Sequence, residues 1–190
     1  MIWRLPLLPI MLRHFATYGY KRTAISTALM YVKMLVIPLI ISILIVGLGK
    51  VSLTDSAIES LITVMAIFAP LLFTALISIH DTRQNLRSRL DQDASQTTKL
   101  EYLLTMYEQL ADNTSFVLAV SILELMALFA VICFPLNSGS SLVKQVVDVL
   151  ILYLLQLILY HMVYVVERLA SLIKVSSRAA AGAGDGGWVI

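Results

Sequence analysis

The sequence predicts an all-α integral membrane protein whose four transmembrane helices form two hairpins. Apolar residues make up 59% of the 190 residues and charged residues 14%, against roughly 45–50% and about 25% in soluble domains. So many apolar side chains cannot all be covered by one core, and the excess must face lipid or partner helices. Four apolar segments also approach the roughly 20 residues that a helix needs to cross about 30 Å of hydrocarbon. We therefore expect the chain to lie in the lipid bilayer.

The expected spans are residues 29–49, 58–79, 116–136 and 146–166. Lys33 lies near one end of the first span, where its ammonium group can reach the surface, and helix is expected from as early as Thr23. Spans two and three lack basic residues, and span three holds one acidic residue, Glu124. The membrane part therefore divides into a first hairpin over 29–79 and a second over 116–168.

The basic residues lie almost entirely on one side of this arrangement. All 14 except Lys50 and Lys144 precede or open the first span, lie between spans two and three, or follow span four. Because loops rich in Lys and Arg stay in the cytoplasm, both termini are predicted to be cytoplasmic. The localisation that this pattern indicates is a bacterial inner (plasma) membrane, crossed several times.

Residues 80–115 form the longest polar stretch and are predicted to continue spans two and three as a cytoplasmic helical hairpin. Apolar residues recur at helical spacing in both halves, and Thr98 with Glu101 fits a capping box for the second helix. One interpretation is a stiff connector. The other is a docking or gating element, because an apolar stripe on a two-helix hairpin stays partly exposed. The residues assigned to docking or gating are Leu86, Leu90, Leu103, Leu104 and Tyr107.

The two ends of the chain are predicted to differ. Residues 1–28 combine apolar and basic side chains without an acidic one, which is typical of an amphipathic segment among lipid headgroups. An arm that binds a protein partner is the alternative. Residues 169–190 are expected to be a flexible cytoplasmic tail, since 179–187 are rich in Ala and Gly. Contacts with the lipid surface are assigned to Trp3, Arg4, Arg13, Lys21 and Arg22.

Glu124 is the candidate functional residue within the membrane. An ionised carboxylate in hydrocarbon costs a few kcal/mol or more, so the side chain should face protein or water, or be protonated. Counting back from Glu167 at the inner end of span four brings His161 or Tyr160 to the depth of Glu124. We therefore expect a carboxylate–imidazole or carboxylate–phenol contact.

Span four carries a polar stripe of its own. Side chains at three-, four- and seven-residue spacing share one face of a helix, and His161 lies on the flank of this face. The stripe can hold neighbouring helices together through hydrogen bonds of roughly 0.6–2 kcal/mol each. Alternatively, it can line a proton or ion path. The residues assigned to the path are Glu124, Tyr153, Gln156, Tyr160 and His161.

Several other classes of protein find little support. Haem ligation between His80 and His161 is disfavoured because His80 lies close to the membrane surface, and no cofactor or metal is expected. No phosphate-binding loop, nucleophile elbow or metalloprotease motif is present, so an enzyme is not expected. Nucleic-acid binding is not expected either, because residues 80–115 hold six acidic and four basic residues.

The sequence leaves two functions open. The first is a small homo-oligomeric channel or membrane-permeabilising effector, of the toxin or bacterial defence type, controlled from the cytoplasm through residues 80–115. The second is a non-catalytic membrane subunit or anchor of a larger complex that docks a cytoplasmic protein partner. The buried acid and the polar stripe exceed what an anchor needs and favour the first.

Overall fold

The computed structural model describes residues 24–49, 51–92, 97–134 and 141–182 and is all-α within them. Four helices make up this part of the chain: α2 (Ala24–Gly47), α3 (Asp55–Gln92), α4 (Thr97–Cys133) and α5 (Ser141–Gly182). Each of the four expected spans overlaps one of these helices, and the all-α prediction is confirmed. Of the interfacial segment predicted over residues 1–28, residues 1–23 lie outside the described residues and residues 24–28 belong to α2.

Three of the helices are long and apolar enough to cross a membrane. The apolar stretches are Asp55–Leu90, Leu100–Cys133 and Leu142–Lys174. In α2 the described apolar stretch, Val32–Gly47, is shorter. The chain is accordingly a multi-pass membrane protein that associates with the lipid bilayer.

These helices are longer than a membrane is thick. α3 has 38 residues and α4 has 37, which at 1.5 Å per residue is roughly 55 Å, against about 30 Å of hydrocarbon. α5 has 42 residues and continues to Gly182, where the sequence predicts a flexible tail from residue 169. All three helices must therefore extend past the hydrocarbon.

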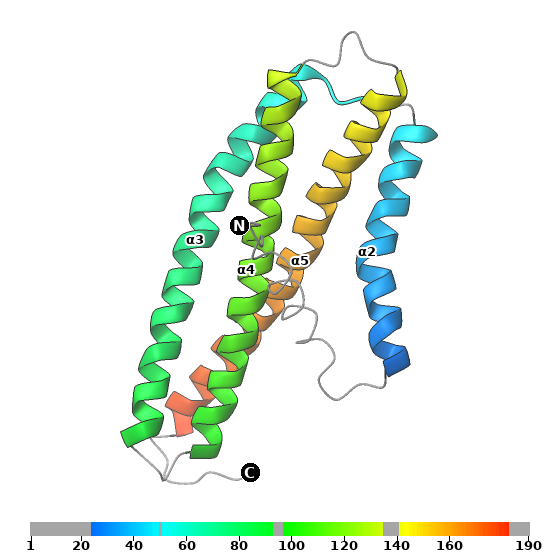
Figure 1. Cartoon of the computed structure of the whole chain (residues 1–190). Coiled ribbons are helices and arrows are strands. Elements are labelled where there is room, and N and C mark those ends of the chain that lie inside the picture. The colour runs from blue at the N-terminus through cyan, green and yellow to red at the C-terminus, as the bar shows by residue number, and fades with distance from the viewer. Residues whose placement is uncertain (1–23, 50, 93–96, 135–140, 183–190) are drawn as a thin grey trace, which may run out of the picture.

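Successive helices run in opposite directions, as Figure 1 shows, and pack in the spatial order α3, α4, α5, α2. α3 passes into α4 through residues 93–96; we call this end of the molecule the hairpin end. α2 passes into α3, and α4 into α5, at the opposite end, which we call the loop end. The arrangement is an open row with α4 and α5 in the middle.

Local sequence explains the turn between α2 and α3. At Gly49 a Cβ atom would lie 2.5 Å from the Ile45 carbonyl oxygen, so only glycine fits there. Thr54 then caps α3, because its Oγ1 accepts a hydrogen bond from the Ala57 N–H at 3.3 Å. Asp55 follows in the first turn, where a negative charge favours the helix dipole.

The core lies among α3, α4 and α5. On α3, Ile58, Met65, Leu72 and Ile79 are buried at intervals of seven residues. This spacing is that of helices that cross at a shallow angle and keep one seam facing a neighbour. Leu110, Val117 and Leu128 of α4 and Ile151, Leu154 and Val165 of α5 belong to the same cluster.

The outer helix α2 buries a single stripe. Met34, Pro38, Ser42 and Val46 are covered, and their four-residue spacing places them on one face. The other faces carry exposed aliphatic side chains; Ile40 is 50% exposed. In a bilayer these faces contact lipid or another protein, as helices that are apolar all round do.

Candidate functional site

The Glu124 carboxyl group is completely enclosed by protein. Its side chain is 0% exposed on α4, inside the apolar stretch Leu100–Cys133. Neither carboxyl oxygen has a hydrogen-bond partner among the described residues. A buried polar group without a partner costs free energy, and a charged one costs more. Glu124 therefore faces protein, and no hydrogen bond from the described part of the chain offsets the cost of burying its carboxyl group.

His161 is also buried, but it does not lie beside Glu124. Its ring packs against Phe116 with 4.7 Å between the ring centroids. Phe116 precedes Glu124 by eight residues, about 12 Å along a helix axis. The predicted contact between Glu124 and His161 is therefore not formed.

Tyr160 is not the partner of Glu124 either. It lies on the outer side of α5, is 37% exposed, and its hydroxyl group lies 3.1 Å from that of Tyr164. The carboxylate–phenol contact predicted for Tyr160 is absent as well.

A second contact fixes the same register between α4 and α5. The Arg168 guanidinium donates a hydrogen bond to the Gln109 side chain. Gln109 is seven residues before Phe116, and Arg168 is seven residues after His161. Continuing this antiparallel register places Tyr153 at the level of Glu124. The sequence count failed because it started from assumed membrane boundaries, whereas side-chain packing along helices that extend past the membrane sets the true register.

The His161 ring has a defined tautomer in its neutral form. Nδ1 lies 2.8 Å from the Leu157 carbonyl oxygen. A carbonyl oxygen only accepts, so Nδ1 must carry the hydrogen and donate it. The basic nitrogen of the neutral ring is therefore Nε2.

Further polar side chains are buried on the same face of α4 as Glu124. Asn113, Thr114 and Ser121 are at most 1% exposed. The Ser121 hydroxyl donates to the Val117 carbonyl oxygen at 2.8 Å, and the Thr114 hydroxyl donates to that of Leu110 at the same distance. Sequence reasoning missed these three residues. Asn113 and Thr114 precede Ser121 by eight and seven residues, and Ser121 precedes Glu124 by three. This helical spacing places them on one face and is the signal that could have found them.

The polar stripe predicted on α5 is only partly covered. Tyr153 and Gln156 are half-buried, whereas Tyr160 and Glu167 are exposed. His161, on the flank of the stripe, is the member that lies in the core. The buried polar side chains thus lie mainly on α4, and α5 contributes His161 and, nearer the loop end, Asp148, which is 4% exposed.

An apolar crevice lies between α4 and α5 towards the loop end. Its volume is about 270 Å³. Ala127, one helical turn beyond Glu124, is the lining residue nearest to it along α4. The lining residues are Ala127, Ala130, Val131, Phe134, Val147, Leu150 and Ile151.

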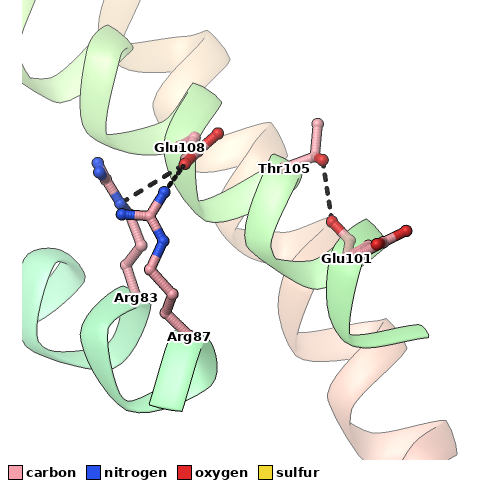
Figure 2. Close-up of polar contacts among 5 residues, drawn as sticks. All are labelled: Arg83, Arg87, Glu101, Thr105 and Glu108. Carbon is pink, nitrogen blue, oxygen red and sulfur yellow. Dashed lines mark hydrogen bonds and ion pairs between the residues drawn. The ribbon is translucent and has the colours of Figure 1, made fainter. Parts of the chain in front are cut away.

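Charged contacts join the helices near the hairpin end. Figure 2 shows Arg83 and Arg87 of α3 pointing towards Glu108 of α4. Arg83 Nε lies 3.7 Å and Arg87 Nη2 3.6 Å from Glu108 Oε1. The adjacent Gln109 accepts from Arg168 of α5. We call Arg83, Arg87 and Glu108 the clasp.

The residues assigned to docking or gating are half-buried. Leu103 and Tyr107 pack against the core, and Leu86, Leu90 and Leu104 are of intermediate exposure. α5 packs against α4, its Arg168 donates to Gln109 near this end, and its Leu172 is buried in the core cluster. The hairpin of residues 80–115 is therefore packed against a third helix, which the sequence analysis did not anticipate.

The described residues contain no group of three or more His, Cys, Asp or Glu side chains that could hold a metal ion. His80 is exposed on α3, whereas His161 is enclosed in the core. The lipid-surface residues Trp3, Arg4, Arg13, Lys21 and Arg22 lie outside the part of the chain that the structure describes.

The fold defines the class of protein as an all-α, multi-pass membrane protein with a buried carboxyl group in its helical core. No family model, no curated protein and no solved structure matches the chain.

Proposed function

We propose that the protein is a small homo-oligomeric channel or membrane-permeabilising effector, of the toxin or bacterial defence type. It crosses a bacterial inner membrane four times with both termini in the cytoplasm and is controlled through residues 80–115. The observation that carries the proposal is the enclosed Glu124 carboxyl group inside the apolar stretch Leu100–Cys133 of α4. Ionisable groups inside membrane helices are costly and mark ion or proton pathways.

The open row of helices supports an oligomer. α2 packs on α5 and leaves its remaining faces exposed, with Ile37 and Leu44 among the uncovered residues. One copy of such a row encloses no wide aqueous path. Several copies can close the row into a ring, in which α2 of each copy meets a neighbour.

The clasp supports control from the hairpin end. It links α3 to α4, and the Gln109–Arg168 bond links α4 to α5 a single residue further along α4. All three helices continue without a break from this level to Glu124 and beyond. A protein that binds residues 80–115 can thus move the helices at membrane depth as levers.

The test is the membrane potential of cells that express the chain, followed with a voltage-sensitive dye. We expect depolarisation with the wild type and at least a tenfold weaker effect with Glu124→Gln at equal membrane levels. The matched control is Glu101→Gln, because Glu101 is on the same helix but exposed. Full activity of Glu124→Gln would remove this carboxyl group from the proposed mechanism.

The alternative function is a non-catalytic membrane subunit or anchor, and the exposed faces of α2 favour it too. A partner subunit in place of a second copy would cover Ile40 and Leu44 equally well. The alternative predicts co-purification of a partner in fixed ratio and poor stability of the chain alone. A monodisperse homo-oligomer that is stable without partners would contradict it.

A further inference from the structure

We propose that the ion conducted is the proton, and that it moves inside each protomer along the buried polar face of α4. This inference rests on the proposed function and deepens it, because it names the transported species and the route. The groups on the route are Glu124, Ser121, His161, Asn113 and Thr114, which together we call the polar file.

The polar file is ordered along the helix axis. Ser121 lies one turn from Glu124 towards the hairpin end, and His161 lies at the level of Phe116. Asn113 and Thr114 follow within one more turn of α4. Successive levels are two to five residues apart, which is a rise of about 3–8 Å along the helix axis, and one or two water molecules can bridge such separations.

Both ends of the polar file lead towards a surface. At the hairpin end, Gln109 and Arg168 lie one turn past Asn113 and are hydrogen-bonded to each other. At the other end, the apolar crevice opens one turn beyond Glu124, at Ala127. With Gln109 at one end, the polar file and the crevice together follow α4 from Gln109 to its last residue, Cys133, and to Phe134 just beyond it.

The chemistry of the polar file favours a proton over a larger cation. A metal cation that enters a protein must exchange its hydration shell for a ring of oxygen ligands. At the level of Glu124 the described residues offer one carboxyl group, the half-buried phenol of Tyr153 and, one turn away, the Ser121 hydroxyl group, which do not form a ring of ligands. All members of the file are at most 1% exposed, so a hydrated ion does not fit beside them. A proton needs only titratable groups with water or hydroxyl groups between them.

Each transfer conserves charge and atoms. The Glu124 carboxyl group releases its hydrogen as a proton to a water molecule on the Ser121 side and becomes a carboxylate. His161 accepts a proton from this water at Nε2 and becomes an imidazolium, while Nδ1–H stays bonded to the Leu157 carbonyl oxygen. The imidazolium then releases the Nε2 proton to water at the level of Asn113. The Glu124 carboxylate recovers a proton from water in the crevice, so one proton enters and one leaves.

The crevice is the barrier in this route. Its lining is apolar throughout, and apolar cavities stay dry unless they are widened or made polar. Hydrophobic constrictions close channels in this way. Conduction therefore requires the crevice between α4 and α5 to open and fill with water, and water to enter between the members of the polar file, which are at most 1% exposed.

The experiment uses the full chain reconstituted into vesicles with a pH-sensitive dye inside. A potassium diffusion potential set with valinomycin drives proton entry, and separate vesicles without valinomycin report K⁺ and Na⁺ fluxes with ion-selective electrodes. We expect proton entry with the wild type and fluxes of K⁺ and Na⁺ at least 100-fold slower. His161→Gln, which keeps polar groups but cannot carry a proton at neutral pH, should slow proton entry at least tenfold.

Two controls distinguish a loss of proton transfer from a loss of folding. Glu124→Asp retains a carboxyl group and should conduct protons, so a loss specific to Glu124→Gln reflects proton transfer and not misfolding. The ion selectivity of the wild type needs no variant at all.

Comparable K⁺ or Na⁺ flux would overturn the proton inference while leaving the channel in place. Unchanged proton entry in His161→Gln would overturn the route. If neither the wild type nor the clasp variant Glu108→Ala conducted any ion, the proposed function itself would fail.

Discussion

His161 packs against Phe116, with 4.7 Å between the ring centroids and 50° between the ring planes. This contact sets the register of α4 against α5 and leaves Glu124 two helical turns from the imidazole. The carboxyl group and the imidazole thus occupy separate levels of one core, and no direct hydrogen bond joins them. Two titratable groups held apart in this way can pass a proton through water between them, whereas a direct ion pair would trap it.

The register can be tested by chemical cross-linking of paired cysteines. We expect cysteines at positions 109 and 168 to be joined within one chain in membranes by a short bifunctional thiol reagent, because the Gln109 and Arg168 side chains reach each other across α4 and α5. Cysteines at Glu124 and His161 should not react. The experiment starts from Cys133→Ser, since Cys133 is an exposed free thiol. Reaction of the second pair alone would restore the register counted from the sequence.

Glu124 is predicted to limit the stability of the fold. Replacing an enclosed carboxyl group that lacks hydrogen-bond partners with an isosteric apolar side chain removes a desolvation penalty, so Glu124→Leu should stabilise the protein by about 1–3 kcal/mol. The measurement is the thermal unfolding midpoint in detergent, with Glu101→Leu as the exposed control. A lower midpoint for Glu124→Leu would show that the carboxyl group has a stabilising partner, such as a second copy of the chain.

The sequence predicted the helices but not how they face one another. The apolar length of a segment is a local property, so the span that contains both Phe116 and Glu124 could be predicted from its own residues. Register is not local: it depends on how Phe116 and His161 fit together, and no pattern in either helix encodes that pairing. The burial of Glu124 followed from its cost in lipid, while the burial of Ser121 was missed because one hydroxyl group bonded to its own helix costs little and leaves a weak signal.

The extension of α5 was missed for a related reason. The Ala- and Gly-rich composition from residue 179 onwards suggests flexibility. No local pattern from residue 169 onwards indicates that a helix there packs against the rest of the protein. In the structure Leu172 enters the core cluster, and burial of apolar side chains stabilises a helix more than intrinsic propensity does. Tertiary packing thus explains why α5 continues beyond the residue at which local composition predicted its end.

The clasp is predicted to control opening and to contribute little to stability. Glu108→Ala removes the carboxylate that faces Arg83 and Arg87, but both pairs are longer than 3.5 Å and partly exposed. Such pairs contribute about 0–1 kcal/mol. We expect an unfolding midpoint close to that of the wild type and faster depolarisation of cells at equal expression. The matched control is Glu101→Ala, an exposed glutamate on the same helix. Slower depolarisation would mean that the clasp holds the open form.

Substitutions in the crevice between α4 and α5 are predicted to change proton conduction while leaving the fold intact. Ala127→Trp places an indole in the crevice one turn beyond Glu124, and we expect it to slow proton entry into vesicles at least tenfold. Ala127→Ser adds a hydroxyl group that favours water there and should speed entry, because a polar group lowers the barrier to wetting. The matched control is Ile132→Trp on the same helix, since Ile132 is 50% exposed and does not line the crevice. If Ala127→Trp left proton entry unchanged while the protein stayed folded and oligomeric, protons would reach Glu124 by a path other than the crevice.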